Sequence, residues 1–460
     1  MMRVFARWPV SGLLFFLTAT VGAESAPPNF IVFAADDMAW DDAGAYGHPS
    51  IQTPNIDRLS KEGLRFDFAF LTTSSCSPSR SSVLTGRYPH STDAGELHQP
   101  LPADQRIVTE LLRERDYFAA AAGKWHLGDP AKSKFDLVLP GGVSGCEQWV
   151  EALQNRPKDK PFFLWLAAFD PHRPYSADAI PRPHTQEDAI VPPFLPDASE
   201  TRTDLALYYD EISRMDRYVG DVLDELERQE ITENTCVIFF SDNGRPFPRC
   251  KTTLYDSGIR TPFIVRYPGV TQPGTVSTSL ISTVDLAPTI AELADVSPSP
   301  LHQGRSFAAL LTNPGRDFRE YAFAEHNWHD YSARERAVRS KSYLYIRNEY
   351  PDLPGTPPAD AVRSETYRLM VSEYEKGRLP SEQSSTFTAP RPAEELYDTV
   401  ADPHSLRNLV DDEGQAEPLQ KLRAALDQWK EETEDNAPDV RRPDEFDRTS
   451  GERLKVTPAH

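Results

Sequence analysis

Three apolar runs of strand length, each followed at once by polar residues, constrain the fold of this chain most. They are Asn29 to Ala35, Phe162 to Phe169 and Thr235 to Phe240. The residues that follow them are Asp36-Asp37, Asp170-Pro171-His172 and Ser241-Asp242-Asn243-Gly244. Continuous apolar runs indicate strands buried on both faces, as in parallel sheets. Because such sheets bind ligands outside the carboxyl ends of their strands, we expect these polar residues to meet at one edge.

Segments with helical periodicity lie between and beside these runs. They are Thr53 to Gly63, Ile107 to Arg115 and Asp204 to Gln229. The last segment carries an apolar stripe through Leu207, Ile212, Met215, Val219, Val222 and Leu226. A stripe of this kind predicts a helix with one buried face. Strands that alternate with helices predict an α/β fold, in which a large, mostly parallel sheet is covered by helices on both faces.

The character of the chain changes after Leu311. Strand-like segments follow at Arg319 to Glu325, Glu335 to Arg339 and Ser342 to Arg347, and a helix-like segment follows at Pro418 to Trp429. We therefore expect a large α/β domain over residues 27–311 and a small C-terminal α+β subdomain with an antiparallel sheet over residues 312–430. The charged, proline-containing residues 431–460 are expected to form a flexible tail.

The N-terminus has the pattern of a secretory signal peptide. Arg3 and Arg7 precede a short, interrupted apolar run, and small residues stand before Glu24. This pattern favours a cleaved signal over a retained anchor helix. We expect residues 1–23 to be removed and the mature chain to be exported, to the periplasm or outside the cell, without a membrane span after processing.

The charge of the chain excludes one class of partner. It has 49 Lys and Arg residues against 70 Asp and Glu residues, a net charge of −21. Nucleic-acid binding depends on neutralising phosphates with clustered Lys and Arg, so no nucleic-acid partner is expected. Net charge governs solubility and long-range steering rather than the content of one pocket, so an anionic small substrate stays compatible with it.

The run from Cys76 to Gly86 says most about function. It reads Cys-Ser-Pro-Ser-Arg-Ser-Ser-Val-Leu-Thr-Gly. Free cysteines are most often small core residues, but the serine- and threonine-rich surroundings from Thr72 to Ser82 argue against that here. The Cys-x-Pro-x-Arg core and the trailing Leu-Thr-Gly resemble the active-site sequence of the type I sulfatases.

The resemblance implies a modified cysteine. In that family a formylglycine-generating or anaerobic maturation enzyme reads the core motif and converts the cysteine to formylglycine. One hydroxyl of the hydrated aldehyde takes the sulfuryl group, and deprotonating the other expels sulfate. The resemblance also implies an alkaline-phosphatase-like fold, a catalytic domain over residues 27–311 and a sulfated saccharide substrate. Conversion of Cys76 would leave Cys146, Cys236 and Cys250, so at most one disulfide is expected.

Four residues at the ends of two predicted strands offer hard oxygen ligands. They are Asp36, Asp37, Asp242 and Asn243. Acids that cap turns after strands are the ordinary alternative. The resemblance implies that these residues, with the modified Cys76, bind one calcium ion per chain. Mg²⁺ demands stricter octahedral geometry and usually keeps several waters, which favours Ca²⁺.

The resemblance also assigns catalytic side chains. Arg80 would stabilise the formylglycine hydrate and the metal shell. Gly123-Lys124-Trp125-His126 matches the family's Gly-Lys-x-His element, in which Lys124 contacts sulfate and His126 accepts a proton during sulfate release. His172 and Lys251 match a substrate-facing histidine and a second lysine. The sequence leaves open which of these two protonates the leaving atom and which clamps the sulfate.

Shorter stretches are most similar to the heparan N-sulfatase, or sulfamidase, branch of the family. They are Ser74 to Arg80, Leu97 to Gln99, Asp170 to Arg173, Arg214 to Asp216, and Ser241 to Gly244 with Pro246 to Pro248. Lys251 departs from that branch, which carries arginine there, so N-sulfate and O-sulfate both stay open. His98 and the stretch from Glu325 to Asp330 are expected to contact the sugar. A transition metal at His326 and His329 would need a third ligand.

Two other function classes are compatible with parts of the pattern. A phosphoryl-transfer relative from the alkaline phosphatase superfamily would share the fold and the metal carboxylates, but the complete modification motif favours sulfuryl transfer. A noncatalytic protein that binds sulfated glycans would have no reason to retain Arg80, Lys124 and His126 around the modification site. That second alternative regains weight if Cys76 is unmodified.

Overall fold

The computed structural model describes residues 1–2 and 26–455. The predicted signal peptide covers residues 1–23, and all of it after residue 2 lies outside the described part of the chain. Residues 456–460 of the predicted tail also lie outside it. Within the described ranges, none of the helices combines the length and the hydrophobicity needed to cross a bilayer.

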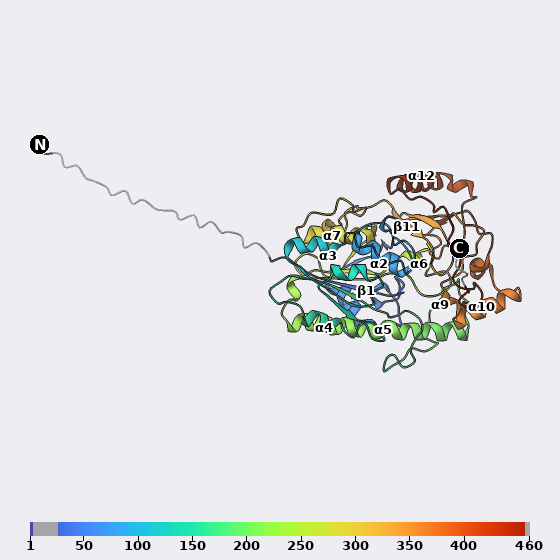
Figure 1. Ribbon diagram of the computed structural model, residues 1–460, viewed down its shortest axis with the longest axis horizontal. Helices are drawn as coiled ribbons and strands as arrows, with labels where there is room; N and C mark the ends of the chain where they lie inside the picture. Colours follow the sequence, from blue (N-terminus) through green and yellow to red (C-terminus); the bar gives the residue numbers. More distant parts are fainter. Residues whose placement is uncertain (3–25, 456–460) are drawn as a thin grey trace.

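An eight-stranded sheet forms the centre of the molecule (Figure 1), in the order β5-β4-β6-β1-β7-β8-β2-β9. Its strands are β1 (Asn29–Ala35), β2 (Leu64–Phe66), β4 (Phe118–Gly123), β5 (Leu137–Pro140), β6 (Phe162–Ala167), β7 (Thr235–Ser241), β8 (Phe263–Arg266) and β9 (Thr275–Ser277). The strands from β5 to β7 are all parallel, whereas β8 runs antiparallel to both its neighbours. The predicted, mostly parallel sheet is confirmed.

Helices cover both faces of this sheet. One face carries α2 (Cys76–Thr85), α3 (Val108–Leu112) and α7 (Leu286–Leu293), and the other carries α4 (Trp149–Gln154) and α5 (Ser199–Arg228). In β1, Phe30 and Val32 belong to the first core, and Ile31 and Phe33 to the second. Successive side chains of a strand point to opposite faces, so a strand with two covered faces needs an unbroken apolar run.

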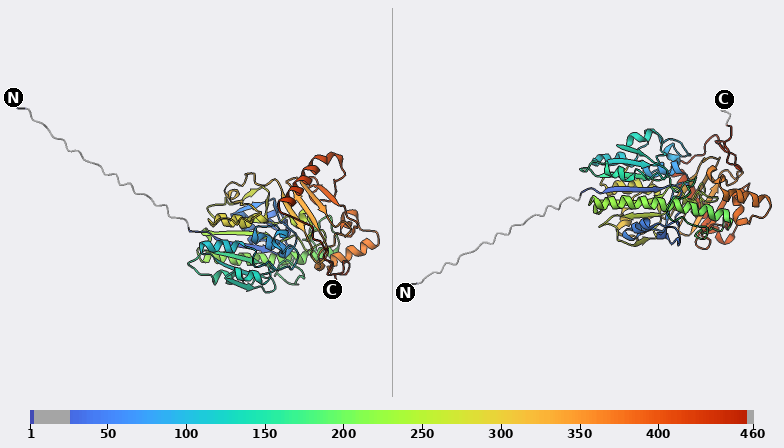
Figure 2. Two further views of the ribbon diagram at one scale, coloured as in Figure 1. Left: turned by 45° about the horizontal axis from the view of Figure 1, so that its top comes forward. Right: turned by 90° about the horizontal axis from the view of Figure 1, so that it is seen from below.

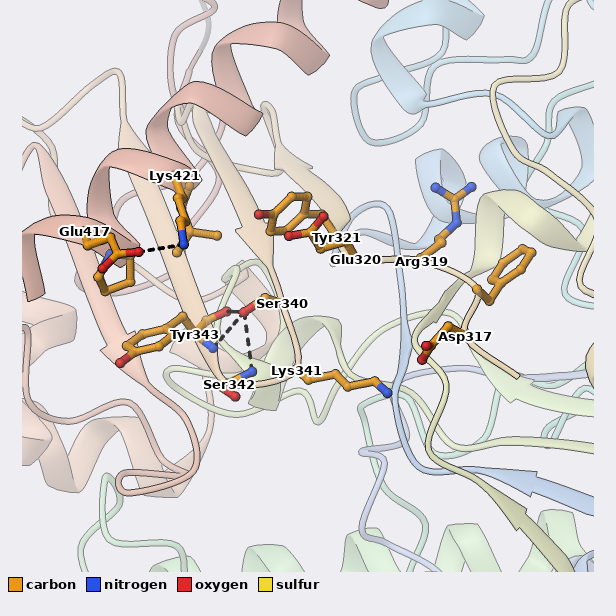
Figure 3. Close-up of a pocket in the computed structure, with 13 residues that line it drawn as sticks. Asp317, Arg319, Glu320, Tyr321, Ser340, Lys341, Ser342, Tyr343, Glu417 and Lys421 are labelled. Atoms are coloured by element: carbon orange, nitrogen blue, oxygen red, sulfur yellow. Dashed lines mark hydrogen bonds and ion pairs between the residues drawn. The ribbon is translucent and has the colours of Figure 1, made fainter. Parts of the chain in front are cut away.

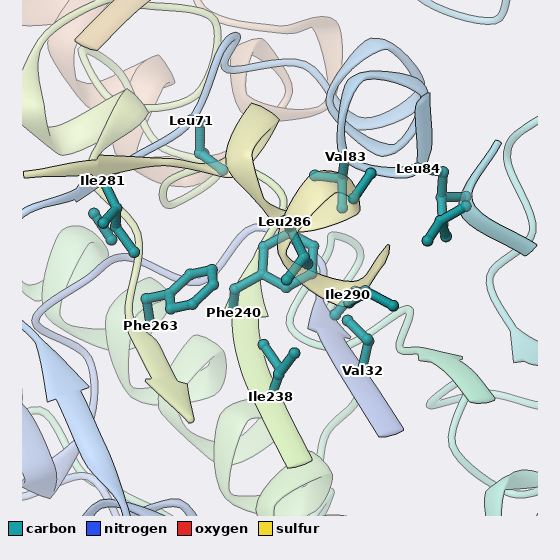
Figure 4. Close-up of a cluster of buried hydrophobic side chains, with 14 of the residues drawn as sticks. Val32, Leu71, Val83, Leu84, Ile238, Phe240, Phe263, Ile281, Leu286 and Ile290 are labelled. Carbon is teal, nitrogen blue, oxygen red and sulfur yellow. The ribbon is translucent and has the colours of Figure 1, made fainter. Parts of the chain in front are cut away.

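Figure 4 shows the core between β7 and α7. Ile238 and Phe240 of β7 lie against Leu286 and Ile290 of the helix, with Val32 of β1 beside them. These side chains are at most 1% exposed. The same packing holds α2 through Val83 and Leu84, so the core fixes the helix that begins at Cys76.

Helix α5 and strand β4 are among the elements of the main domain that differ from the sequence-based expectation. Helix α5 begins at Ser199 rather than Asp204, because its first turn is polar and lies outside the apolar stripe. Strand β4 was not predicted, since alanine is depleted in strands and four of its six residues are alanine. In the sheet, β4 is paired on both sides, to β5 and β6.

A second, antiparallel sheet lies at one end of the molecule (Figure 2). It contains β11 (Ala322–His326), β12 (Glu335–Arg339), β13 (Tyr343–Asn348) and β14 (Glu394–Asp398), in that order. Helix α12 (Ala416–Glu432) covers it with Leu419, Leu422, Leu426 and Trp429. The three predicted strands and the closing helix are confirmed, and β14 is an addition.

The residues after α12 pack onto this end of the molecule. Asp435 accepts hydrogen bonds from Arg336, and Nε1 of Trp328 donates to the carbonyl of Pro443 over 2.8 Å. The backbone N–H of Ser332 donates to Asp444 over 2.7 Å. Long-range ion pairs and hydrogen bonds thus connect residues 433–455, which the composition predicts to be part of a flexible tail, to this end of the molecule.

We expect Gly123→Ala to destabilise the fold. Gly123 has φ +97°, and an added Cβ would lie 1.9 Å from the carbonyl oxygen of Ala167 and 2.3 Å from that of Gly145. Relief requires backbone movement between β4 and β6. Strain and overpacking together should lower the free energy of unfolding by on the order of 2–4 kcal/mol, measured by urea denaturation. Gly315→Ala, with nothing within 4 Å, is the matched control and should change it little.

Candidate active site

Carboxylates from two neighbouring strands meet beside Cys76. Asp36 and Asp37 follow β1, Asp242 follows β7, and Cys76 opens α2. One ligand atom from each of these four residues lies within 4.8 Å of those of the others. All four residues are buried. The structure thus brings together the strand ends that the sequence predicts to meet.

Cys76 contacts the carboxylates of this cluster through Asp37. Its Sγ is 3.9 Å from Oδ1 of Asp37. Burial raises the pKa of the Cys76 thiol well above its usual range, and the nearby lysines only partly offset this. A thiol needs its thiolate form to act as a nucleophile. The unmodified cysteine is therefore a poor nucleophile here.

Arg80 connects the helix to the carboxylates. It lies one turn after Cys76 and so faces the same side of α2. Its Nε donates to Oδ2 of Asp242 over 2.7 Å, and Nη1 donates to the carbonyl oxygen of Lys124 over 2.9 Å. Nη2 is 3.7 Å from Oδ1 of Asp36. The side chain is completely buried, so this guanidinium is a fixed charge of the site.

Two lysines complete the pairing. Nζ of Lys124 donates to Oδ2 of Asp36, and Nζ of Lys251 donates to Oδ2 of Asp37 over 2.8 Å. Both lysines are buried. Burial opposes their charged form, but Asp37 raises the pKa of Lys251 well above its usual range. The three carboxylates thus face three cations, although the chain as a whole is acidic.

The carboxylates differ in their protonation. Burial raises the pKa of Asp37 and the pKa of Asp242 to about 6. Burial acts on Asp36 as well, but Lys124, His172 and Arg80 outweigh it and hold the pKa of Asp36 far below its usual range. The cluster therefore contains more buried negative charge than its neighbours fully stabilise.

Oxygen atoms of the cluster fit a hard cation. Oδ1 of Asp36 and Oδ1 of Asn243 are buried and have no hydrogen-bond partner among the described residues. Nδ2 of Asn243 donates to Asp37, which places this amide in the cluster. Carboxylate and amide oxygens are the ligands that Ca²⁺ prefers. These side chains can hold a calcium ion.

Two histidines stand side by side at the edge of the cluster. Nδ1 of His98 and Nε2 of His126 are 2.7 Å apart, and the backbone N–H of His98 donates to Oγ of Ser77 over 2.9 Å. Burial, and then the charges of Lys124 and Arg80, lower the pKa of His126 well below its usual range. His126 is therefore a neutral imidazole.

His172 lies near Asp37 of the cluster and near a second residue, Asp360, which the sequence analysis missed. Its Nε2 is 3.9 Å from Oδ2 of Asp37 and 3.5 Å from Oδ2 of Asp360. Burial, Lys251 and Lys124 lower the pKa of His172 to about 4. Asp360 belongs to α9 (Ala359–Val362), far along the chain. No motif marks it, since only the packing of α9 brings it to the site.

Some of the other predicted residues reach the site and others do not. His329 reaches the site, because its Nδ1 lies 2.7 Å from Oγ of Ser75, the residue before Cys76. His326 is buried in β11. Among the described residues the two histidines belong to no group of three metal-ligating side chains. Cys146, Cys236 and Cys250 are buried free thiols, so the described structure contains no disulfide.

A separate cavity of about 720 Å³ lies against the C-terminal sheet and α12 (Figure 3). Tyr321, Tyr343 and Lys341 are among its lining residues. None of the predicted catalytic or metal-binding residues lines it. Its charged groups include Lys421 paired with Glu417, a neutral surface pair rather than a buried charged cluster. The chemistry of the chain is thus concentrated at the strand ends and not in this cavity.

The chain is similar to known proteins. The model of the Sulfatase family matches residues 28–139 and 146–296, and the model named N-sulphoglucosamine sulphohydrolase, C-terminal, matches residues 249–375. A human N-sulphoglucosamine sulphohydrolase is 31% identical over an alignment 461 residues long. This alignment covers 90% of this chain and 91% of that protein. An ulvan-active sulfatase of Formosa agariphila is 29% identical, over 87% of this chain and 74% of that protein.

The fold is also similar to solved structures. One is a complex of a protein with its substrate D-glucosamine-2-N,6-O-disulfate. It aligns with a TM-score of 0.69 and 21% identity, over 90% of this chain and 99% of that one. At this identity the likeness concerns the fold alone.

We expect Lys251→Met to raise the pKa of His172 from about 4. After burial, the charge of Lys251 is the largest cause that lowers it, while Asp36 and Asp360 raise it. Removing the ammonium should move the pKa upward, because a nearby positive charge disfavours the imidazolium. NMR titration of the imidazole in calcium-free protein measures it. Lys160→Met, which removes an exposed lysine paired with Asp116, is the control, and equal shifts in both variants would contradict this account.

Proposed function

Since the chain belongs to the sulfatase family and is a sulfuric ester hydrolase, we propose that it removes sulfate from sulfated carbohydrates. We further propose that formylglycine made from Cys76 and one calcium ion complete its active site. The observation that carries this proposal is the buried cluster of Asp36, Asp37 and Asp242 around Cys76, paired with three cations.

Formylglycine and calcium would supply chemistry that the unmodified side chains lack. Hydrated formylglycine would offer one hydroxyl as nucleophile and a second whose deprotonation releases sulfate. A divalent ion would supply a Lewis acid for the sulfate oxygens and for a hydroxyl group. We propose that Asp36, Asp37, Asp242 and Asn243 hold this ion together with the modified Cys76. Their unpartnered oxygens and the raised pKa values of Asp37 and Asp242 support the assignment.

The cationic side chains are proposed to bind and orient the sulfate group. Lys124 and Lys251 are buried against Asp36 and Asp37, so an ion that neutralises those carboxylates frees lysine N–H groups for sulfate oxygens. Arg80 is held from two sides and stays fixed. Donors fixed in advance stabilise charge that develops in the transition state, because they need no reorganisation.

Two histidines are proposed to move protons. His126 is neutral and can accept a proton at a free nitrogen. His172 faces the cluster beside Asp360, where a leaving group can be reached. His172 and Lys251 both remain candidates for protonating the leaving atom. A general acid or base of this kind typically contributes ~10²–10⁴ in rate.

The type of sulfate is the finer question. The match to the C-terminal model and the human relative support removal of N-sulfate from glucosamine. Lys251 in place of the arginine of that branch, and the ulvan-active relative, support O-sulfate esters. We propose a carbohydrate sulfatase, with N-sulfoglucosamine sulfohydrolase as the specific alternative. A noncatalytic protein that binds sulfated glycans is the outcome if Cys76 is unmodified.

The proposal also covers the maturation, the export and the domain organisation of the chain. We propose that a formylglycine-generating or anaerobic maturation enzyme acts on Cys76, and that the chain is exported. Residues 27–311 are proposed as the catalytic domain and residues 312–430 as the C-terminal subdomain. Asp360, which falls in the proposed second unit, lies 3.5 Å from Nε2 of His172 in the proposed first unit.

The experiment that tests the function is NMR of glucosamine with N- and 6-O-sulfate groups, incubated with the mature chain and Ca²⁺. Loss of either sulfate supports the proposal, and the position lost separates the sulfamidase from the O-sulfatase. Mass spectrometry of the Cys76 peptide should show the aldehyde in place of the thiol. Cys76→Ala should abolish turnover. Persistent activity in that variant, or an active enzyme with an intact thiol, would sink the mechanism.

Calcium affinity should depend on pH. Carboxylate ligands must be deprotonated to bind metal. Burial raises the pKa of Asp37 and of Asp242 to about 6, so both carry protons below that pH and lose them above it. Affinity should therefore rise with pH through about 6 and level off by neutral pH, measured by isothermal titration calorimetry. Asp242→Asn should weaken binding at neutral pH, whereas the exposed Asp129→Asn should not.

A further inference from the structure

His98 contacts the histidine proposed as the base of the reaction. Its Nδ1 lies 2.7 Å from Nε2 of His126, with the ring centroids 4.9 Å apart. Both residues have positive φ, 65° for His98 and 48° for His126. This conformation costs free energy for non-glycine residues, although histidine adopts it more often than most, and such residues cluster at functional sites. The surrounding structure therefore fixes the positions of the two histidines.

The Cys76 motif itself anchors this pair. The backbone N–H of His98 donates to Oγ of Ser77, the residue after Cys76. Lys124, two residues before His126, bonds to Asp36 of the carboxylate cluster. Both histidines are thus fixed relative to the same reacting centre, although His98 is exposed and Nδ1 of His126 is buried.

Only one of the two facing nitrogens can carry the proton of this hydrogen bond. Nδ1 of His126 has no partner among the described residues, and the charges of Lys124 and Arg80 act on that ring. A positive field favours a lone pair over an N–H at a buried nitrogen. The N–H of the bond therefore belongs to Nε2 of His126.

We propose that His98 is a positioning residue that accepts this N–H and holds His126 in the tautomer whose Nδ1 is free to take a proton. The inference rests on the proposed function for the role of His126. When a hydroxyl in the site gives its proton to Nδ1, the bond from Nε2 to His98 persists and stabilises the imidazolium. A neutral histidine needs such an orienting partner, because either nitrogen can carry its single proton.

The positive φ of His98 permits a matched pair of variants. Glycine and asparagine both tolerate this conformation, so neither should strain the backbone. His98→Gly removes the acceptor, whereas His98→Asn places its Oδ1 where Nδ1 stood. His302→Asn, a change of a histidine packed on Gly86, serves as the control. Urea denaturation verifies that the three variants stay folded.

The first readout is the tautomer of His126, from ¹⁵N NMR of histidine-labelled protein, assigned with His126→Gln. We expect a bare Nδ1 and a protonated Nε2 in the wild type and in His98→Asn, and a mixture of tautomers in His98→Gly. A protonated Nδ1 in the wild type, or an unchanged tautomer in His98→Gly, overturns the proposal. This readout does not require turnover, so it stands apart from any failure of the sulfatase assignment.

The second readout is the turnover of a small aryl sulfate, which lacks the sugar that His98 could touch. His98→Gly should lower kcat roughly tenfold or more, a part of the ~10²–10⁴ that a positioned base supplies. His98→Asn should stay within about threefold of the wild type, with KM little changed in both. Equal losses in the two variants would instead make His98 only a substrate contact. The same conclusion would follow if the variants changed only KM, and only in a separate assay with the saccharide.

Discussion

The rest of this structure depends on one constraint, the pairing of buried charges at the carboxyl ends of β1 and β7. Three buried carboxylates, Asp36, Asp37 and Asp242, lie side by side, and a buried charge without a partner costs several kcal/mol. Their partners come from three separate segments: Arg80 lies in α2, Lys124 follows β4, and Lys251 lies in the loop after β7. The apolar cores on both faces of the sheet must therefore place α2, β4 and the loop after β7 together before the charges can be neutralised.

The sequence predicts those parts of the molecule that obey a local period or follow a strand. All seven residues of β1 are buried, and the six apolar ones after Asn29 belong to the two cores, so an unbroken apolar run marks the strand. Parallel strands present their carboxyl ends at one edge, which is why the predicted ligands of the metal lie together. Helix α5 is predicted by its stripe, but its polar first turn carries no such signal.

The missed parts depend on contacts between distant segments. Asp360 reaches His172 only because α9 packs beside the strand ends, and its surroundings in the sequence contain no motif. Asp435 is buried by Arg336, 99 residues away, although the composition around it is that of a loose tail. Strand β4 forms because pairing on both sides outweighs the weak strand preference of alanine.

Lys251 connects this geometry to the choice of substrate. Its ammonium is compact and can give up a proton, whereas a guanidinium stays charged and is planar. The oxygen released from a sulfate ester and the nitrogen released from a sulfamate both take up a proton as the bond to sulfur breaks. A lysine that lies 2.8 Å from Asp37 and shares its surroundings with His172 can hold such a proton, which a guanidinium does not give up. Calcium bound by Asp37 would weaken the pairing that raises the pKa of Lys251, and would make that proton easier to transfer.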